Sequence, residues 1–92
     1  MTREAAETIA LQALAWLVTN EDLLPVFLGA TGASTDDLRD RASDPEFLGA
    51  VLGFLTMDDA WVTGFCDAMG HDYATPMTAR GMLPGGAEVH RT

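Results

Sequence analysis

The chain has 92 residues and a formal net charge of −9, because fourteen acidic residues stand against five arginines and no lysine. Nucleic-acid backbones and anionic membrane surfaces are bound through clustered basic residues, so this balance argues against either as a direct partner. One cysteine permits no internal disulfide. The composition is 48% apolar, and no segment alternates β-branched with polar residues as a strand would, which predicts an all-α fold.

The length fits one domain over residues 1–92, which we expect to be a single compact bundle of five or six short helices with a central helical hairpin. Residues 85–92 are expected either to fray or to lie across the body. The apolar segment from Ile9 to Val18 lacks a basic segment before it, so it does not have the pattern of a signal peptide. No apolar run approaches the roughly 18 residues of a membrane span, and we expect a cytoplasmic protein.

Thr2 can cap a first helix that continues to about Val18. Between Ile9 and Val18 only Gln12 is polar. A helix that is apolar nearly all round is either buried on several sides or partly covered by another subunit. The central-helix interpretation is favoured, and a dimer or partner interface is the alternative.

Asn20 predicts the cap of a second helix, although Pro25 lies late enough that the regular helix could begin there. Gly32 is the expected end of this helix, because glycine favours the left-handed conformation found there. The side chains expected to face the core are Leu23, Leu24, Phe27 and Leu28.

Ser34 and Asp37 have the spacing of a capping box, which predicts a short helix through about Ala42. Leu38 is its only large apolar residue, so this helix is expected at the surface. Asp44 and Pro45 then provide a cap and a first-position proline for the next helix.

The stretch from residue 44 to residue 69 holds most of the large apolar side chains, in two adjacent rows that would lie on one helical face. Asp58 and Asp59 interrupt both rows. In one unbroken helix these carboxylates would be buried without partners, at a cost of roughly several kcal/mol each. A hairpin of helices 45–56 and 59–69 is favoured instead, with Asp58 as the cap of the second helix.

Small residues recur at helical spacing on both halves of this hairpin: Gly49 and Gly53 on the first, and Ala60, Gly64 and Ala68 on the second. Such rows predict close packing of the two helices against each other rather than a ligand groove. Gly53→Leu would then destabilise the fold through overpacking.

Gly70 is expected to end the second hairpin helix. Thr75 and Pro76 repeat the cap-plus-proline pattern for a last short helix through about Leu83. The Pro-Gly-Gly run at 84–86 should stop it.

The nearest approach to a metal or acid–base cluster consists of Asp58, Asp59, Asp67, His71 and Asp72. Asp67 and His71 are one helical turn apart, so both could reach one ion. Two-residue ligand sets are common by chance, and capping or surface roles are favoured. We therefore assign no catalytic residue, metal or cofactor.

Cys66 follows Phe65 on an apolar row in acidic surroundings, which favours a buried thiol over a nucleophile. The large aromatic residues are expected to be core anchors rather than a cofactor cage: Trp16, Trp61, Phe47, Phe54 and Phe65.

Several segments form a recognisable set, among them DPEFLGAVLGFL, MDDAWVTGFCDA, LPGG, ETIALQALAWL and FLGATG. In these the chain resembles, from about Thr8 to its C-terminus, a family of short bacterial proteins known as a domain of unknown function. The resemblance implies a small helical cytoplasmic protein and supplies no activity, substrate or catalytic residue.

The favoured function is that of a non-enzymatic, acidic interaction or regulatory module that uses apolar helix surface to bind itself, as a homodimer, or another protein. The alternative is a metal-dependent or acid–base module that uses Asp58, Asp59, Asp67 and His71. A role in nucleic-acid biology comes third and depends on mimicry of DNA charge by the acidic surface.

Overall fold

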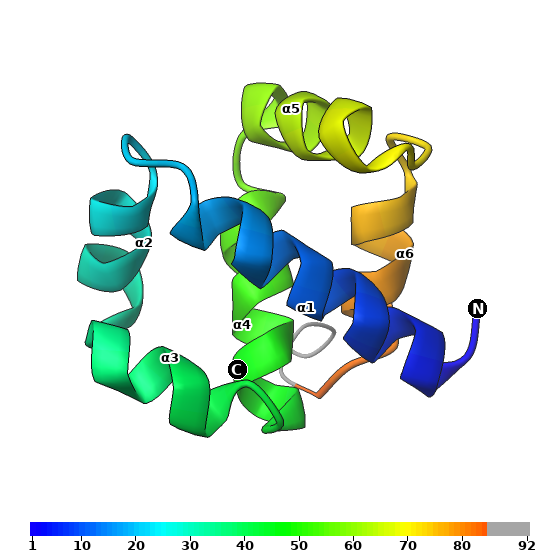
Figure 1. The fold of residues 1–92 in the computed structure, drawn as a ribbon. Coiled ribbons are helices and arrows are strands. Elements are labelled where there is room, and N and C mark those ends of the chain that lie inside the picture. The colour runs from blue at the N-terminus through cyan, green and yellow to red at the C-terminus, as the bar shows by residue number, and fades with distance from the viewer. Residues whose placement is uncertain (85–92) are drawn as a thin grey trace, which may run out of the picture.

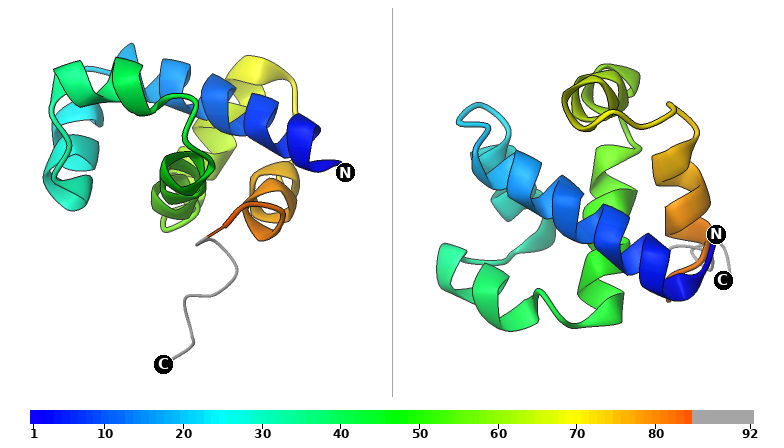
Figure 2. Two further views of the ribbon diagram at one scale, coloured as in Figure 1. Left: turned by 90° about the horizontal axis from the view of Figure 1, so that it is seen from below. Right: turned by 45° about the vertical axis from the view of Figure 1, so that its right-hand side comes forward.

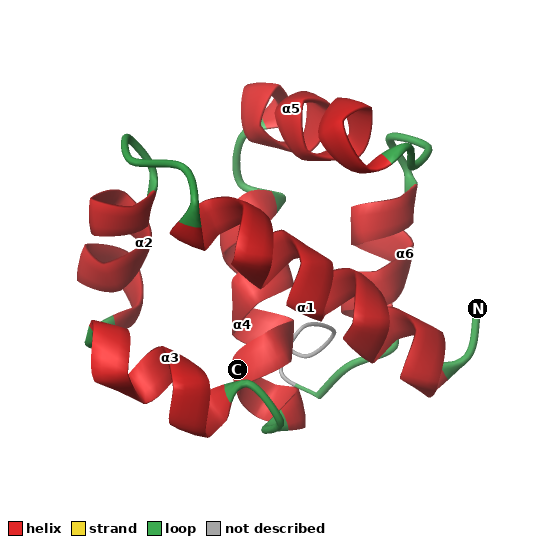
Figure 3. Cartoon of the chain, viewed as in Figure 1, coloured by secondary structure: helices red, strands yellow, loops and turns green. Residues whose placement is uncertain are grey.

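A computed structural model describes residues 1–84 of the chain, and this part is built from helices joined by short loops (Figure 3). Its helices, in chain order, are α1 (Arg3–Val18), α2 (Leu24–Thr31), α3 (Thr35–Arg41), α4 (Pro45–Leu55), α5 (Asp59–Met69) and α6 (Thr75–Gly81). The all-α prediction is confirmed. None of these helices is long and apolar enough to cross a membrane.

Helices α1 and α4 form the centre of the molecule. Seven of the eleven residues of α4 are buried, and α1 crosses it in front, as Figure 1 shows. The other closely packed partners of α1 are α6, α2 and α5. The interpretation of the first helix as central is therefore confirmed, although one of its faces remains exposed.

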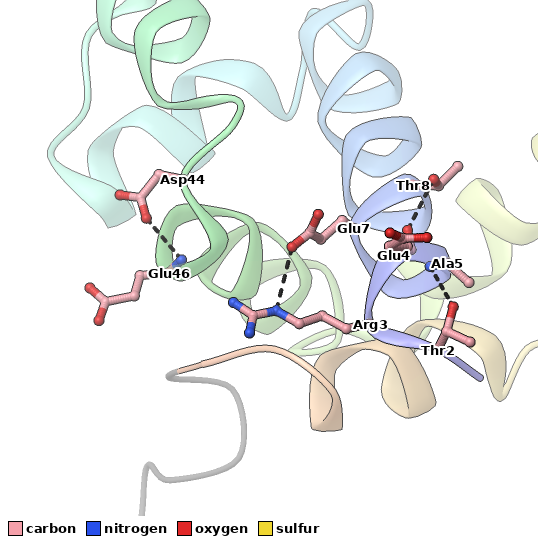
Figure 4. Close-up of polar contacts among 8 residues, drawn as sticks. All are labelled: Thr2, Arg3, Glu4, Ala5, Glu7, Thr8, Asp44 and Glu46. Carbon is pink, nitrogen blue, oxygen red and sulfur yellow. Dashed lines mark hydrogen bonds and ion pairs between the residues drawn. The ribbon is translucent and has the colours of Figure 1, made fainter.

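The starts of α1 and α4 have the expected caps (Figure 4). The Thr2 hydroxyl accepts the Ala5 N–H at 3.0 Å, and the Asp44 carboxylate accepts the Glu46 N–H at 3.0 Å. Each bond satisfies one of the free N–H groups that a helix start leaves without an intrahelical partner. The sequence pattern therefore located both starts correctly.

Helix α3 also begins as expected. The Ser34 hydroxyl accepts the Asp37 N–H at 3.3 Å, and the Asp37 carboxylate accepts the Ser34 N–H at 3.0 Å. This reciprocal pair is a capping box with aspartate in place of glutamate. Leu38 is the one buried residue of this helix, in agreement with a surface position.

The prediction for the start of α2 is correct only in part. The Asn20 carboxamide accepts the N–H groups of Asp22 and Leu23, both at 3.2 Å, but this stabilises a preceding turn. Regular helix begins at Leu24, with Pro25 in its first turn, because proline lacks an N–H and fits only there. Gly32 ends α2 with a φ of 73°, as expected.

The break between α4 and α5 is confirmed. The Asp58 carboxylate accepts the Ala60 N–H at 2.8 Å and the Trp61 N–H at 3.4 Å, so it caps α5. Gly70 ends α5 in the left-handed conformation, with a φ of 77°. The two halves of the hairpin therefore exist as separate helices joined by a short turn.

The expected packing of the two small-residue rows against each other is wrong. A Cβ atom at Gly64 would lie 3.2 Å from the Trp16 indole of α1, and one at Gly53 would lie 4.0 Å from Arg80 Nε of α6. Helix α5 lies across the end of α4 rather than along it (Figure 2). Gly64 and Gly53 therefore lie next to side chains of other helices, which no local pattern specifies.

The cap expected at Thr75 is also wrong. Thr75 is the first residue of α6, and Ala74 precedes it without a side-chain capping bond. Pro76 sits in the first turn as expected, and the helix ends at Gly81, two residues earlier than predicted. Gly85 and Gly86, expected to stop the helix, and the tail that follows lie outside the described residues.

The aromatic residues differ in how deeply they are buried. Phe27 is fully buried between Phe47 and Phe54, with ring centroids 6.1 and 5.3 Å away. Trp16 and Trp61 are only partly buried, against Phe65 and Phe54 respectively. The core-anchor interpretation is confirmed for the phenylalanines, and the tryptophans cover the edge of the core.

Candidate functional site

The five acidic and histidine residues singled out in the sequence lie at opposite ends of α5. Asp58 caps the start of this helix, and Asp59 is exposed in its first turn. Asp67 lies near the other end, about 12 Å along the axis from Asp59 at roughly 1.5 Å per residue. These two groups therefore cannot bind one ion together.

At the C-terminal end of α5 the side chains are engaged with protein groups. The Tyr73 hydroxyl donates to Asp67 Oδ1 at 2.8 Å, and this hydrogen bond raises the pKa of Tyr73 above its usual value. His71 Nε2 lies 2.6 Å from Gln12 Oε1 of α1, and its ring packs against Phe65. Asp67, His71, Asp72 and Tyr73 line a hollow of about 180 Å³.

Within residues 1–84, no three His, Cys, Asp or Glu side chains are close enough together to hold a metal ion. The Asp72 side chain is exposed, and its backbone carbonyl accepts a hydrogen bond from the Cys66 thiol at 3.3 Å. This end of α5 therefore consists of paired contacts that connect α5 to α1 and to the following loop.

Cys66 is buried, with 1% of its surface exposed, as the sequence predicted. Burial raises the pKa of its thiol, and the nearby Asp67 and Asp72 charges raise it further. The reactive form of cysteine is the thiolate. At neutral pH this thiol is consequently protonated and shielded, which does not suit a nucleophile.

An apolar hollow lies between α1, α2 and α3. Its volume is about 520 Å³, and most of its lining is apolar. Its lining residues are Leu11, Leu14, Ala15, Val18, Thr19, Leu24, Thr35, Leu38, Arg39 and Ala42. We call this surface the α1–α3 groove.

The α1 wall of the α1–α3 groove is an exposed apolar stripe. Leu11, Ala15 and Val18 follow one another at helical spacing, and Leu11 and Val18 are 43% and 44% exposed. The buried Leu14 and Leu38 lie deeper among the lining side chains. An apolar side chain from another molecule could therefore reach apolar surface on two helices.

The groove exists because α2 and α3 are short helices that leave one face of α1 uncovered. Helix α3 carries one large apolar residue, Leu38, and it does not appear among the closely packed helix pairs of the described chain. The left-handed turn at Gly32 directs the chain from α2 into α3 at the side of the molecule (Figures 1 and 2). The outer face of α1 is left open between them.

A second hollow, between α2 and α4, has a volume of about 440 Å³ and a more polar lining. Arg41 lines it, with the guanidinium 5.1 Å from the centre of the Phe47 ring. Asp44 and Glu46 also line it, and Met57 at its edge is 75% exposed. Because charged groups occupy this hollow, it offers less apolar surface than the α1–α3 groove.

The sequence alone did not identify the α1–α3 groove. The apolar character of the first helix gave the signal, since Leu11 and Val18 lie outside the face that packs on α4 and α6. Which apolar face stays exposed depends on where α2 and α3 lie, and their positions depend on long-range contacts.

The family model described as "Protein of unknown function (DUF3572)" matches residues 3–86. This match confirms the resemblance drawn from the sequence. Neither the comparison with curated proteins nor that with solved structures found a match.

Proposed function

Because this chain belongs to DUF3572, a family of unknown function, its role must be argued from geometry, and we propose that it is a non-enzymatic protein-interaction module. The proposed binding surface is the α1–α3 groove. The supporting observation is the exposed apolar stripe of Leu11 and Val18 beside the buried Leu14 and Leu38. Apolar patches that remain on a folded surface commonly mark sites of association.

The alternative, a metal-dependent or acid–base module at Asp58, Asp59, Asp67 and His71, has less support. Asp58 is occupied as a helix cap, and Asp67 and His71 have protein hydrogen-bond partners. A titration with divalent ions tests it, since a stability increase that depends on Asp67 and His71 would favour a site there.

A cytoplasmic location remains part of the main proposal, because the single cysteine needs no oxidising compartment.

A matched pair of substitutions tests the proposed surface. Leu11→Gln places an amide in the α1–α3 groove, whereas Val26→Gln makes the corresponding change on α2, at a residue that is 48% exposed and does not line the groove. Circular dichroism and thermal unfolding should show that both variants fold. The two substitutions then differ mainly in location.

Wild-type protein and Val26→Gln should capture a partner from lysate, whereas Leu11→Gln should not. Once the partner is purified, it should likewise bind wild type and Val26→Gln more tightly than Leu11→Gln. Equal retention by both variants would place the interaction elsewhere, and a monomer that retains nothing at any concentration would remove the basis of the proposal.

A further inference from the structure

We infer that the α1–α3 groove receives an amphipathic α-helix with basic flanking residues, supplied by a different protein rather than by a second copy of this chain. This inference rests on the proposed function and names the class of partner. It is carried by two observations, the spacing of the apolar anchors and the charges at the edges of the groove.

The anchors of the α1–α3 groove have the spacing of a helix-binding surface. Leu11, Ala15 and Val18 extend about 10 Å along α1 at roughly 1.5 Å per residue. Leu38 of α3 and Ala42, the residue that follows α3, lie one turn apart and line the same groove. An amphipathic helix presents apolar side chains at matching intervals of three and four residues, so about two of its turns would match these anchors.

The lining of the groove has one charged residue, Arg39, and four exposed acidic residues lie in the segments next to it. Asp36 and Asp40 are exposed on α3, on either side of Arg39, and together with Thr35 they line an adjoining hollow. Glu21 and Asp22 are exposed in the turn between α1 and α2. The ion pair found within residues 1–84, Arg3 with Glu7, involves none of these four acids. They are available to attract a cationic partner.

The same charges disfavour a second copy of the chain. Each copy carries a formal charge of −9, so two copies of this chain repel each other overall. Opposed like charges cost affinity and slow association. Basic residues that flank an apolar helical face would instead meet the acids on α3 and in the α1–α2 turn.

Three synthetic helical peptides with one shared leucine face test the inference. Their polar faces carry lysine, glutamine or glutamate, and binding is measured by fluorescence anisotropy at low salt and at about 1 M salt, where the Debye length falls to about 3 Å. The lysine peptide should bind at least about tenfold more tightly than the glutamate peptide at low salt, a difference of about 1.4 kcal/mol. High salt should reduce this difference.

Variants distinguish groove binding from unspecific attraction to an acidic protein. Leu11→Gln and Val18→Gln should weaken binding of the lysine peptide, whereas Val26→Gln should not. The double substitution Asp36→Asn with Asp40→Asn should weaken binding of the lysine peptide at low salt. It should leave binding of the glutamine peptide unchanged. Amide chemical-shift changes should concentrate on residues that line the groove.

Each other outcome overturns the inference in an identifiable way. Equal binding of the lysine and glutamate peptides removes the charge selection, and equal effects of Leu11→Gln and Val26→Gln remove the groove. Concentration-dependent dimerisation that Leu11→Gln abolishes would assign the groove to a second copy. If none of the peptides binds but a groove-dependent partner is captured from lysate, the inference fails and the proposed function stands; if that capture also fails, both fall.

Discussion

The Trp16 indole of α1 lies directly over Gly64 of α5, so closely that a Cβ atom at Gly64 would be 3.2 Å from Trp16 Cζ2. Trp16 also contacts Phe65 edge-on, with ring centroids 6.0 Å apart. Through these contacts the indole holds α5 against α1. The absence of a side chain at position 64 therefore sets how closely the two helices approach.

Gly64→Leu should destabilise the protein by about 1–3 kcal/mol, because the larger side chain must displace the indole. Gly29→Leu is the matched control, since Gly29 is also in a helix but has no neighbouring atom within 4 Å of an added Cβ. Helix propensity alone should make this control neutral or stabilising. Urea unfolding compares the two, and equal effects would mean that the Trp16 contact does not limit packing.

Loss of the Asp58 cap should destabilise α5. Asp58→Ala removes the acceptor for the Ala60 and Trp61 N–H groups and should cost about 0.5–2 kcal/mol in the free energy of unfolding. Asp58→Asn, which keeps an acceptor oxygen, should retain most of the stability. An increase in stability on replacement by alanine would instead indicate that the carboxylate is unfavourably buried.

The capping box of α3 should make stability depend on acid. The Ser34 backbone N–H, followed by the Ser34 hydroxyl, lowers the pKa of Asp37 below its usual value. A lowered carboxyl pKa stabilises the folded state above the unfolded value, and this contribution is lost as pH falls through the folded value. In a pH series extending below about 4, Asp37→Asn should show less acid-dependent loss than wild type.

A nuclear magnetic resonance titration of the Asp37 carboxyl carbon tests the cause. In Ser34→Ala the pKa of Asp37 should rise part of the way toward its ordinary value, because the backbone N–H remains. Asp36→Asn, outside the capping box, should leave the Asp37 pKa low. No change in Ser34→Ala would remove the hydroxyl as a contributor.

The Cys66 thiol should react slowly with a disulfide reagent in the native protein. Burial and raised pKa both reduce access to the thiolate, so reaction requires local opening. The native rate should be about a hundredfold or more below the rate in urea, equivalent to an opening free energy of about 2.7 kcal/mol. As Cys66 is the one cysteine of the chain, absorbance of the released thiol reports it alone, and similar native and unfolded rates would contradict its shielding.

Much of the secondary structure follows from local chemistry, and the sequence alone was sufficient to predict it. Caps at Thr2, Ser34, Asp44 and Asp58 occur where predicted, because each satisfies backbone N–H groups within three residues of itself. Local reasoning was wrong at Thr75, which became the first residue of α6 rather than its cap. A cap at Thr75 would have made Pro76 the first helical residue, but the helix begins one residue earlier, after the turn at Ala74.

The partners of each helical face were decided only by tertiary structure. Gly64 was correctly identified as a packing site, but its neighbour is Trp16, which lies 48 positions away in the sequence. Likewise, the apolar character of α1 could be read directly, whereas the exposure of Leu11 and Val18 depends on α2 and α3 leaving that face uncovered. Capping energies act within one turn of the chain, but the burial of a face depends on which distant segments reach it, and this is why the α1–α3 groove appears only in the folded structure.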